Sequence, residues 1–340
     1  MTTNQPVGKD GARDCPTSDS TTRSRPEAFK ERFRAYTTAL FLLAGSAFVI
    51  HYVFENRSSI TEAFSQLRPL PALAALAVSV SGYVAVGSAW SDVLKAFGSP
   101  PVPRLRAFSI SSVSWLGRYI PGKVWLFAAR ATLTRSEGVP LRIVTAAIAA
   151  EVLLFMVAGL VVSLLLSPFA LMPEHLSRWL SWLGLAAGAG LAATLHPKIW
   201  GLIERALVRG GDAPTLSRNR VFLALAQYSF AFGAWAFSYF LVAASFSPIP
   251  VSAAPGFCAI VSASWLVGFF AFFAPAGIGV RESLIGAYLA GQLGVPVPTA
   301  FATVAAARLL ATVAEGLCIS IGVFVLGVKR IRQPAGIPED

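Results

Sequence analysis

The stretch Pro275-Ala276-Gly277-Ile278-Gly279-Val280-Arg281-Glu282 interrupts a long apolar region of the chain. Proline and glycine both disfavour a continuing helix. An arginine and a glutamate side by side are costly at membrane depth. A helix that breaks there, next to two charges, is better explained by a binding site than by an ordinary transmembrane span.

The composition around this stretch is that of a polytopic membrane protein. The chain has 340 residues, of which 55% are hydrophobic and 13% charged, with a mean hydropathy of +0.63. Its net charge of +11 comes from basic residues in the loops between apolar runs, which is the positive-inside pattern and not the signature of a nucleic-acid-binding protein. The three cysteines are scattered and form no metal or redox pair, so we expect no metal and no cofactor.

Six apolar runs have about the length that crosses a bilayer, and we expect an all-α protein. The predicted spans are residues 36–54, 70–90, 141–166, 179–195, 221–246 and 300–328. Residues 1–34 are rich in Thr, Ser, Pro and charge and are predicted to be a disordered cytoplasmic tail, and residues 331–340 a second cytoplasmic tail. The transmembrane domain is predicted to occupy residues 35–330.

Two further apolar regions are interrupted, and we interpret each as a re-entrant helical hairpin. The first covers residues 105–138 and breaks at Gly117-Arg118-Tyr119-Ile120-Pro121-Gly122-Lys123; the second covers residues 257–294 and breaks at the opening stretch. In the first region, neither apolar piece is long enough to span a membrane alone.

The two interrupted regions resemble each other, which indicates an internal repeat. Residues 112–116 (SVSWL) recur as 262–266 (SASWL), and Gly138-Val139-Pro140 recurs as Gly294-Val295-Pro296. Each half, about 35–167 and 179–328, reads as span, span, hairpin, span. Three spans per half place the halves in opposite orientations, which is the inverted-repeat arrangement of transporters whose sites lie between broken helices.

The distribution of Lys and Arg gives the expected topology. With both termini in the cytoplasm of a multi-pass cell-membrane protein, the basic loops at residues 92–106 and 196–220 fall inside, and the uncharged segment 247–256 falls outside.

The two breaks supply residues suited to a phosphate group. Arg118, Lys123 and Arg281 are the cations, and backbone N–H groups around Gly122, Gly277 and Gly279 add positive potential, as at a helix N-terminus. The alternative is that each cation snorkels to the interface or pairs with a carboxylate.

Four more charges lie within or beside the spans: Glu151, Glu282, Arg308 and Glu315. Arg308 and Glu315 are seven residues apart and share a helix face. We hypothesise that Glu151 or Glu282 pairs with Arg308 or Arg281 across the interface between the halves. Such a pair either holds the bundle together, or changes partner or protonation during transport. Aromatic residues near the breaks, Trp115 and Trp265 among them, either line an acyl-chain groove or pack in the bundle.

The two break motifs together resemble the lysylphosphatidylglycerol synthase transmembrane-region family, a flippase-like domain, over about residues 35–330. The resemblance implies a helical lipid-handling domain that translocates a phospholipid or a lipid-linked sugar. Its motif residues map to Arg118, Pro121, Gly122, Lys123, Gly277, Gly279, Arg281 and Glu282. Full synthases carry a soluble aminoacyl-transferase domain after the membrane region, whereas this chain continues only about a dozen residues, so we do not expect lysine transfer.

The leading hypothesis is therefore a non-enzymatic membrane protein that flips a lipid between leaflets. The lipid would be an anionic or aminoacylated phospholipid, or a polyprenyl-phosphate-linked sugar. The alternative is a non-transporting partner that presents lipid to a separate glycosyltransferase or synthase. A third reading, an enzyme using Glu151 or Glu282, lacks an accompanying nucleophile or metal set, and no nucleotide-binding or hydrolase motif is present.

Overall fold

A computed structural model of the chain describes residues 68–119, 124–170, 217–270 and 279–332, with side chains up to residue 327. Every regular element in these ranges is a helix. The predicted spans at 36–54 and 179–195, the tail 1–34 and most of the tail 331–340 lie outside the described residues.

Five helices in these ranges are long and apolar enough to cross a membrane. They are α3 (Pro69–Ala96), α6 (Leu141–Leu166) with its 3-10 extension η2 (Ser167–Phe169), α9 (Arg218–Phe246), α10 (Ala254–Phe270) with the preceding η3 (Val251–Ala253), and α12 (Val297–Arg332). Four of them, α3, α6, α9 and α12, correspond to predicted spans. The chain is thus an all-helical protein of the multi-pass membrane type.

Prolines set where several of these helices begin. Pro69 opens α3, Pro140 caps α6, and Pro296 precedes α12. Proline has no N–H to lose in a first helical turn, and its fixed φ suits that position. The preceding glycines, Gly138 and Gly294, both have positive φ, so the two Gly-Val-Pro triplets form similar turns in the two halves.

The two interrupted regions contain short helices. The first consists of α4 (Arg104–Ser114), the 3-10 turn η1 (Trp115–Tyr119) and α5 (Val124–Arg135). The second consists of α10 and α11 (Val280–Gly291). Helices α4, α5 and α11 have 11 or 12 residues, too few to span a bilayer. Helix α10 with η3 has 20, so it is long enough to span alone, and the re-entrant hairpin there stays a prediction.

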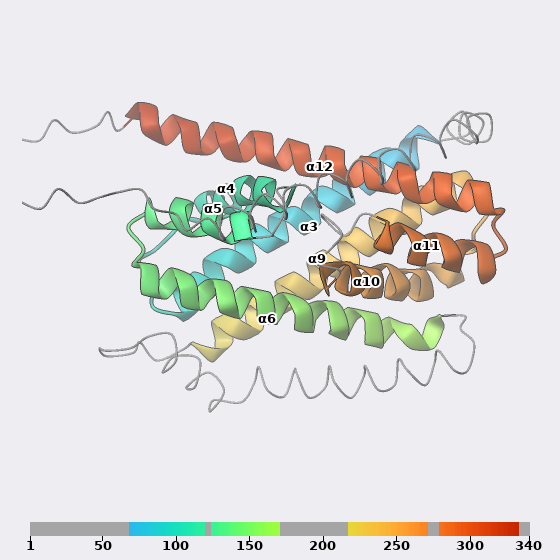
Figure 1. Ribbon diagram of the computed structural model, residues 1–340, viewed down its shortest axis with the longest axis horizontal. Coiled ribbons are helices and arrows are strands. Elements are labelled where there is room, and N and C mark those ends of the chain that lie inside the picture. The colour runs from blue at the N-terminus through green and yellow to red at the C-terminus, as the bar shows by residue number, and fades with distance from the viewer. Residues whose placement is uncertain (1–67, 120–123, 171–216, 271–278, 333–340) are drawn as a thin grey trace, which may run out of the picture. The chain divides into compact units, whose positions relative to one another are not determined.

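Helices α3 and α9 pack along each other and carry much of the core (Figure 1). Ser238 of α9 donates a hydrogen bond of 2.8 Å to the carbonyl of Ala75 on α3. Near the middle of the pair, the Trp235 indole lies against Gly82, where a Cβ atom would come within 2.6 Å of its Nε1. A small residue on one helix thus allows a large aromatic on the other to be buried.

Helix α12 packs against both interrupted regions, contacting α4 in the first and α11 in the second. Near its C-terminal part, Arg106 of α4 donates to the carbonyl of Val325. Near its N-terminal part, the ring of Phe301 lies against Gly286 of α11, where a Cβ atom would come within 3.0 Å of it. Figure 1 shows α12 running past α4 and α11. The opposite side of α12 exposes large apolar side chains: Leu309, Val313, Leu317, Ile321 and Phe324. An exposed apolar stripe of this length suits contact with lipid.

Candidate functional site

A cavity of about 140 Å³ lies where both interrupted regions meet α6 and α9. A single water needs only roughly 10–15 Å³ measured in this way, so the cavity is large enough for a small polar head group. Its charged lining comes from Arg118, Arg130, Arg281 and Glu151. The other lining residues are apolar or aromatic, and include Trp115, Leu126, Phe127, Phe155, Met156, Trp235, Trp265 and Phe269.

Three tryptophans form an aromatic wall at this cavity. Trp235 of α9 stacks on Trp265 of α10 with ring centroids 5.0 Å apart and planes 13° from parallel. Trp115 of η1 meets the edge of Trp235 at 5.9 Å. Each half contributes one outer ring, Trp115 or Trp265, from the same position of the SVSWL and SASWL segments.

Arg281 is the buried cation beside this wall. It lies in the first turn of α11, after Gly279, whose φ of 88° is accessible mainly to glycine. Its side chain is 9% exposed, and its guanidinium carbon sits 3.9 Å from the centre of the Trp265 ring. The side chain passes directly over Gly268, where a Cβ atom would lie 2.6 Å from Nε. Gly268 therefore provides the space in which Arg281 is buried.

No carboxylate lies within ion-pair distance of Arg281 in the described ranges, and its buried Nε has no hydrogen-bond partner there. Burial and the like charges of Arg308 and Arg118 both disfavour the charge on Arg281. An arginine guanidinium nevertheless stays protonated at neutral pH, so Arg281 is a charge in a place that disfavours it.

Arg118, at the first break, is paired. Its guanidinium lies 5.4 Å from the centre of the Trp115 ring, much as Arg281 lies on Trp265. Unlike Arg281, it forms an ion pair with Glu315, a buried residue of α12. The alternative given above for this cation, pairing with a carboxylate, is therefore what the structure shows, although the side chain still reaches the cavity.

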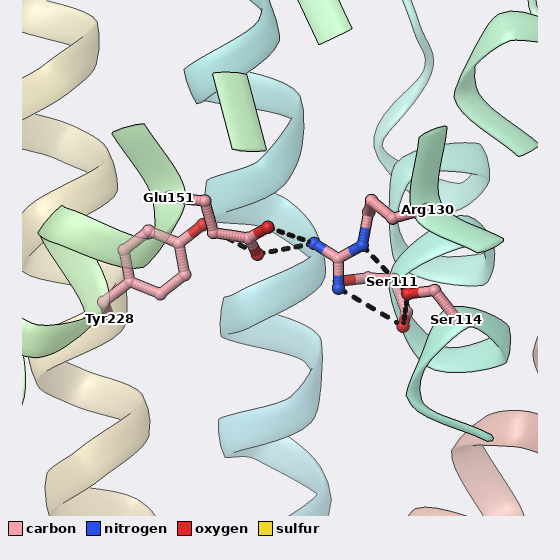
Figure 2. Close-up of polar contacts among 5 residues, drawn as sticks. All are labelled: Ser111, Ser114, Arg130, Glu151 and Tyr228. Carbon is pink, nitrogen blue, oxygen red and sulfur yellow. Dashed lines mark hydrogen bonds and ion pairs between the residues drawn. The ribbon is translucent and has the colours of Figure 1, made fainter. Parts of the chain in front are cut away.

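Arg130 and Glu151 form the centre of a buried polar network (Figure 2). Arg130 Nη1 on α5 donates to both carboxylate oxygens of Glu151 on α6 at 2.5 Å, and Arg130 Nε donates to Ser114 Oγ at 2.9 Å. Ser114 in turn donates to the carbonyl of Ser111, and the Tyr228 hydroxyl donates to Glu151 at 3.3 Å. The carboxylate thus receives hydrogen bonds from two elements and is held between them.

The Glu282 carboxylate interacts with two partners at the second break. One carboxylate oxygen accepts the backbone N–H of Gly279 at 2.7 Å, which caps the start of α11. The other lies 3.7 Å from Nε of Arg308 on α12. The Gly279 N–H is therefore occupied by the Glu282 carboxylate, while phosphate binding by the N–H groups around this glycine stays a prediction.

The predicted charge partners are found in part. Of the four pairings considered between Glu151 or Glu282 and Arg308 or Arg281, the structure contains Glu282 with Arg308, within one half of the chain. Glu151 pairs with Arg130 instead. Arg308 and Glu315 share a face of α12, as expected, and each contacts a residue beside a different break. Gly122, Lys123 and Gly277 lie outside the described residues.

Two buried charged residues were missed by the sequence reasoning. Arg130 lies in the second apolar piece of the first interrupted region, and an arginine inside such a short apolar helix was the available signal. Asp92 of α3 is fully buried, with Arg220 at 2.8 Å and Gln227 at 3.1 Å, and its signal was an acid near the end of an apolar span. Asp92 does not line the cavity, so we assign it to helix packing.

Neither a scan against protein-family models nor a search of curated proteins gives a match for this chain.

Proposed function

We propose that this protein binds the anionic head group of a lipid in the central cavity and moves that head group between membrane leaflets. The lipid is a membrane phospholipid or a lipid-linked sugar, and the protein acts without a cofactor and without chemical change to the lipid. Arg281 is the principal contact for the head group, with Arg118 beside it.

The observation that carries the proposal is the state of Arg281. It is buried, it lines the cavity, and within the described ranges it lacks a carboxylate partner. Leaving a charge buried and uncompensated costs several kcal/mol, about 3–5 when a partner has been removed. An anion entering the cavity would supply the missing partner, so the cost is recovered when ligand binds.

The rest of the lining suits an amphiphilic ligand. Beside the arginines the wall consists of apolar side chains such as Leu126, Phe127, Phe155 and Met156. A lipid presents one polar end and apolar chains, which match the arginines and the apolar side chains of this wall respectively. The cavity chemistry therefore favours a lipid head group.

Similarities between the two interrupted regions support alternating access. Ser114 donates to the carbonyl of Ser111, and Ser264 donates to that of Val261, at positions 150 residues apart in both cases. Each region ends at a positive-φ glycine before a long helix. Paired short helices around one central site suit a transporter built from inverted halves. The resemblance to the flippase-like family points to the same function.

The test is a head-group accessibility assay in proteoliposomes. Vesicles containing the purified full chain and a trace of fluorescent phosphatidylglycerol are exposed to an impermeant quencher, and the fraction quenched reports movement to the outer leaflet. We expect the wild type to move lipid and Arg281→Met to lose most of this movement. Arg142→Ala, at an exposed arginine at the start of α6, is the matched control and should behave as wild type.

Two outcomes would contradict the proposal. If wild-type vesicles quench no faster than protein-free vesicles but the protein still binds the lipid, it presents lipid to another enzyme instead of moving it. If Arg281→Met moves lipid at the wild-type rate, the cavity is not the site.

A further inference from the structure

We propose that the head group bound in this cavity carries a single negative charge and no cationic group, as a simple phosphodiester does. This inference rests on the proposed function and narrows its ligand. It excludes aminoacylated and zwitterionic head groups, and it disfavours doubly charged ones.

The charges at the cavity do not balance. Among the described residues, four arginines and three glutamates lie at the cavity or at the adjoining breaks. Each glutamate is matched to one arginine, in the pairs Arg118–Glu315, Arg130–Glu151 and Arg308–Glu282. Arg281 is the arginine that remains, so the described part of the site has an excess of one positive charge.

A low-dielectric site selects the ligand that neutralises it. Uncompensated charge is expensive away from water, so a complex with no net charge is favoured over one with excess charge of either sign. One excess positive charge is neutralised by one negative charge. A head group with two negative charges would leave one uncompensated, and a zwitterionic head group has no net charge and would leave the excess positive charge in place.

The hydrogen-bonding groups of the cavity also disfavour a primary ammonium group. A ligand ammonium that carries N–H groups needs an acceptor, and the one carboxylate among the described lining residues, Glu151, already accepts from Arg130 and Tyr228. The Glu282 carboxylate is occupied by Gly279 and Arg308. In contrast, the buried Nε of Arg281 is a free donor. The described polar lining thus offers a donor to phosphate oxygens and no spare acceptor to an amine.

Arginine is well suited to this ligand. The guanidinium is planar and presents a fork of N–H groups that binds two oxygens of one phosphate at once. Trp265 supports the plane of Arg281 from one side at 3.9 Å, and Gly268 leaves room for its stem. The group is therefore positioned before ligand arrives, which reduces the entropy lost on binding.

The experiment measures competition by short-chain lipids on the purified full chain in nanodiscs, with fluorescent phosphatidylglycerol as tracer. The competitors share dioctanoyl chains and differ in head group: phosphatidylglycerol, phosphatidylcholine, lysylphosphatidylglycerol, and phosphatidic acid at pH 8, where its phosphate is doubly ionised. We expect phosphatidylglycerol to compete about 10- to 100-fold better than the choline and lysyl lipids, the range of one charge-assisted hydrogen bond.

Two water-soluble probes distinguish a lipid head group from a free anion. Glycerophosphoglycerol carries the same phosphodiester without chains, and inorganic phosphate carries the oxyanion alone. If either competes as well as dioctanoyl phosphatidylglycerol, the ligand is a soluble anion and the lipid part of the proposal is overturned.

Charge variants test the balance directly. Glu282→Gln keeps an acceptor oxygen for the Gly279 N–H but removes the negative charge beside Arg308, and Glu315→Gln removes the negative charge beside Arg118. Each variant therefore adds one unit of positive charge to the described part of the site. We expect the preference to shift towards phosphatidic acid by about tenfold in both variants. The Arg142→Ala control should keep the wild-type order.

The proposed function and the inference about head-group charge can fail separately. If no lipid binds, the proposed function itself fails. If phosphatidylglycerol binds but the lysyl or choline lipid competes equally, the function stands and the charge inference is wrong. If Glu282→Gln and Glu315→Gln leave the order of competitors unchanged, charge balance does not set the selectivity.

Discussion

Arg130 on α5 and Arg281 on α11 are both buried arginines on short helices that follow a break in the chain, yet their surroundings differ. Arg130 meets Glu151, Ser114 and the ring of Trp90, whose centre lies 4.9 Å from its guanidinium carbon. Arg281 meets Trp265 and lacks a carboxylate partner in the described ranges. The first arginine is held by partners within the fold, whereas we propose the second as a ligand contact. The feature that distinguishes them is the missing carboxylate partner in the described ranges, not burial, which both share.

The α5–α6 pair should therefore respond most strongly to mutation. Arg130→Ala leaves Glu151 without its ion-pair partner and should reduce the free energy of unfolding by about 3–5 kcal/mol. Thermal or denaturant unfolding of the purified protein in detergent measures this. Arg135→Ala, at an exposed arginine of the same helix, is the control and should change stability by less than about 0.5 kcal/mol.

The double variant Arg130→Leu with Glu151→Leu sharpens this result. Since replacing both members of a buried pair by apolar residues is often neutral, we expect it to be more stable than Arg130→Ala. If the double variant is the less stable of the two, the network contributes more than charge compensation.

Gly117, at the first break, should give the next largest effect on stability. At Gly117 a Cβ atom would lie 2.4 Å from the backbone nitrogen of Leu126, so the start of α5 would have to move. We expect Gly117→Ala to reduce the unfolding free energy by about 1–3 kcal/mol, as overpacking does. Gly291→Ala, at the end of α11 with open space around it, should have little effect in the same unfolding assay. Equal effects would show that Gly117 is not needed for close approach.

Gly268→Ala should affect ligand binding more than stability. The added methyl would lie 2.6 Å from Nε of Arg281. Because the arginine side chain is flexible, it would move away from Trp265 and the backbone would stay in place. We expect about a tenfold loss of affinity for phosphatidylglycerol, or about 1.4 kcal/mol. The same assay on Gly233→Ala, where a Cβ atom meets nothing, should show wild-type affinity. A loss of binding in both variants would remove the role of this contact.

The Arg308–Glu282 pair should show the smallest stability change. Its atoms are 3.7 Å apart and both side chains are about one-fifth exposed, whereas Arg130 is fully buried. We expect Glu282→Gln to change the unfolding free energy by no more than about 1 kcal/mol. A loss as large as that of Arg130→Ala would mean that both regions are equally structural.

The sequence predicted where the described long helices lie in the chain, but it did not predict which charged side chains pair. Proline at the start of α6 and before α12, and apolar runs of spanning length, predicted both elements because these signals are local in the chain. The partner of Glu151 was misassigned because it lies on another helix, and pairing across helices depends on their rotation and depth. Gly268 carried no sequence signal at all, since its importance comes from a side chain that begins thirteen residues later.

The sequence by itself determined an all-helical protein of the multi-pass membrane type with two charged interruptions, because hydropathy and helix-breaking residues act over a few turns. Tertiary structure decided what the charges at those interruptions do. Packing against α12 and α6 gives carboxylates to Arg118 and Arg130, while the stretch Pro275 to Glu282 places Arg281 on Trp265 without one. That difference depends on distances of a few ångströms between separate helices, which only the packed structure fixes.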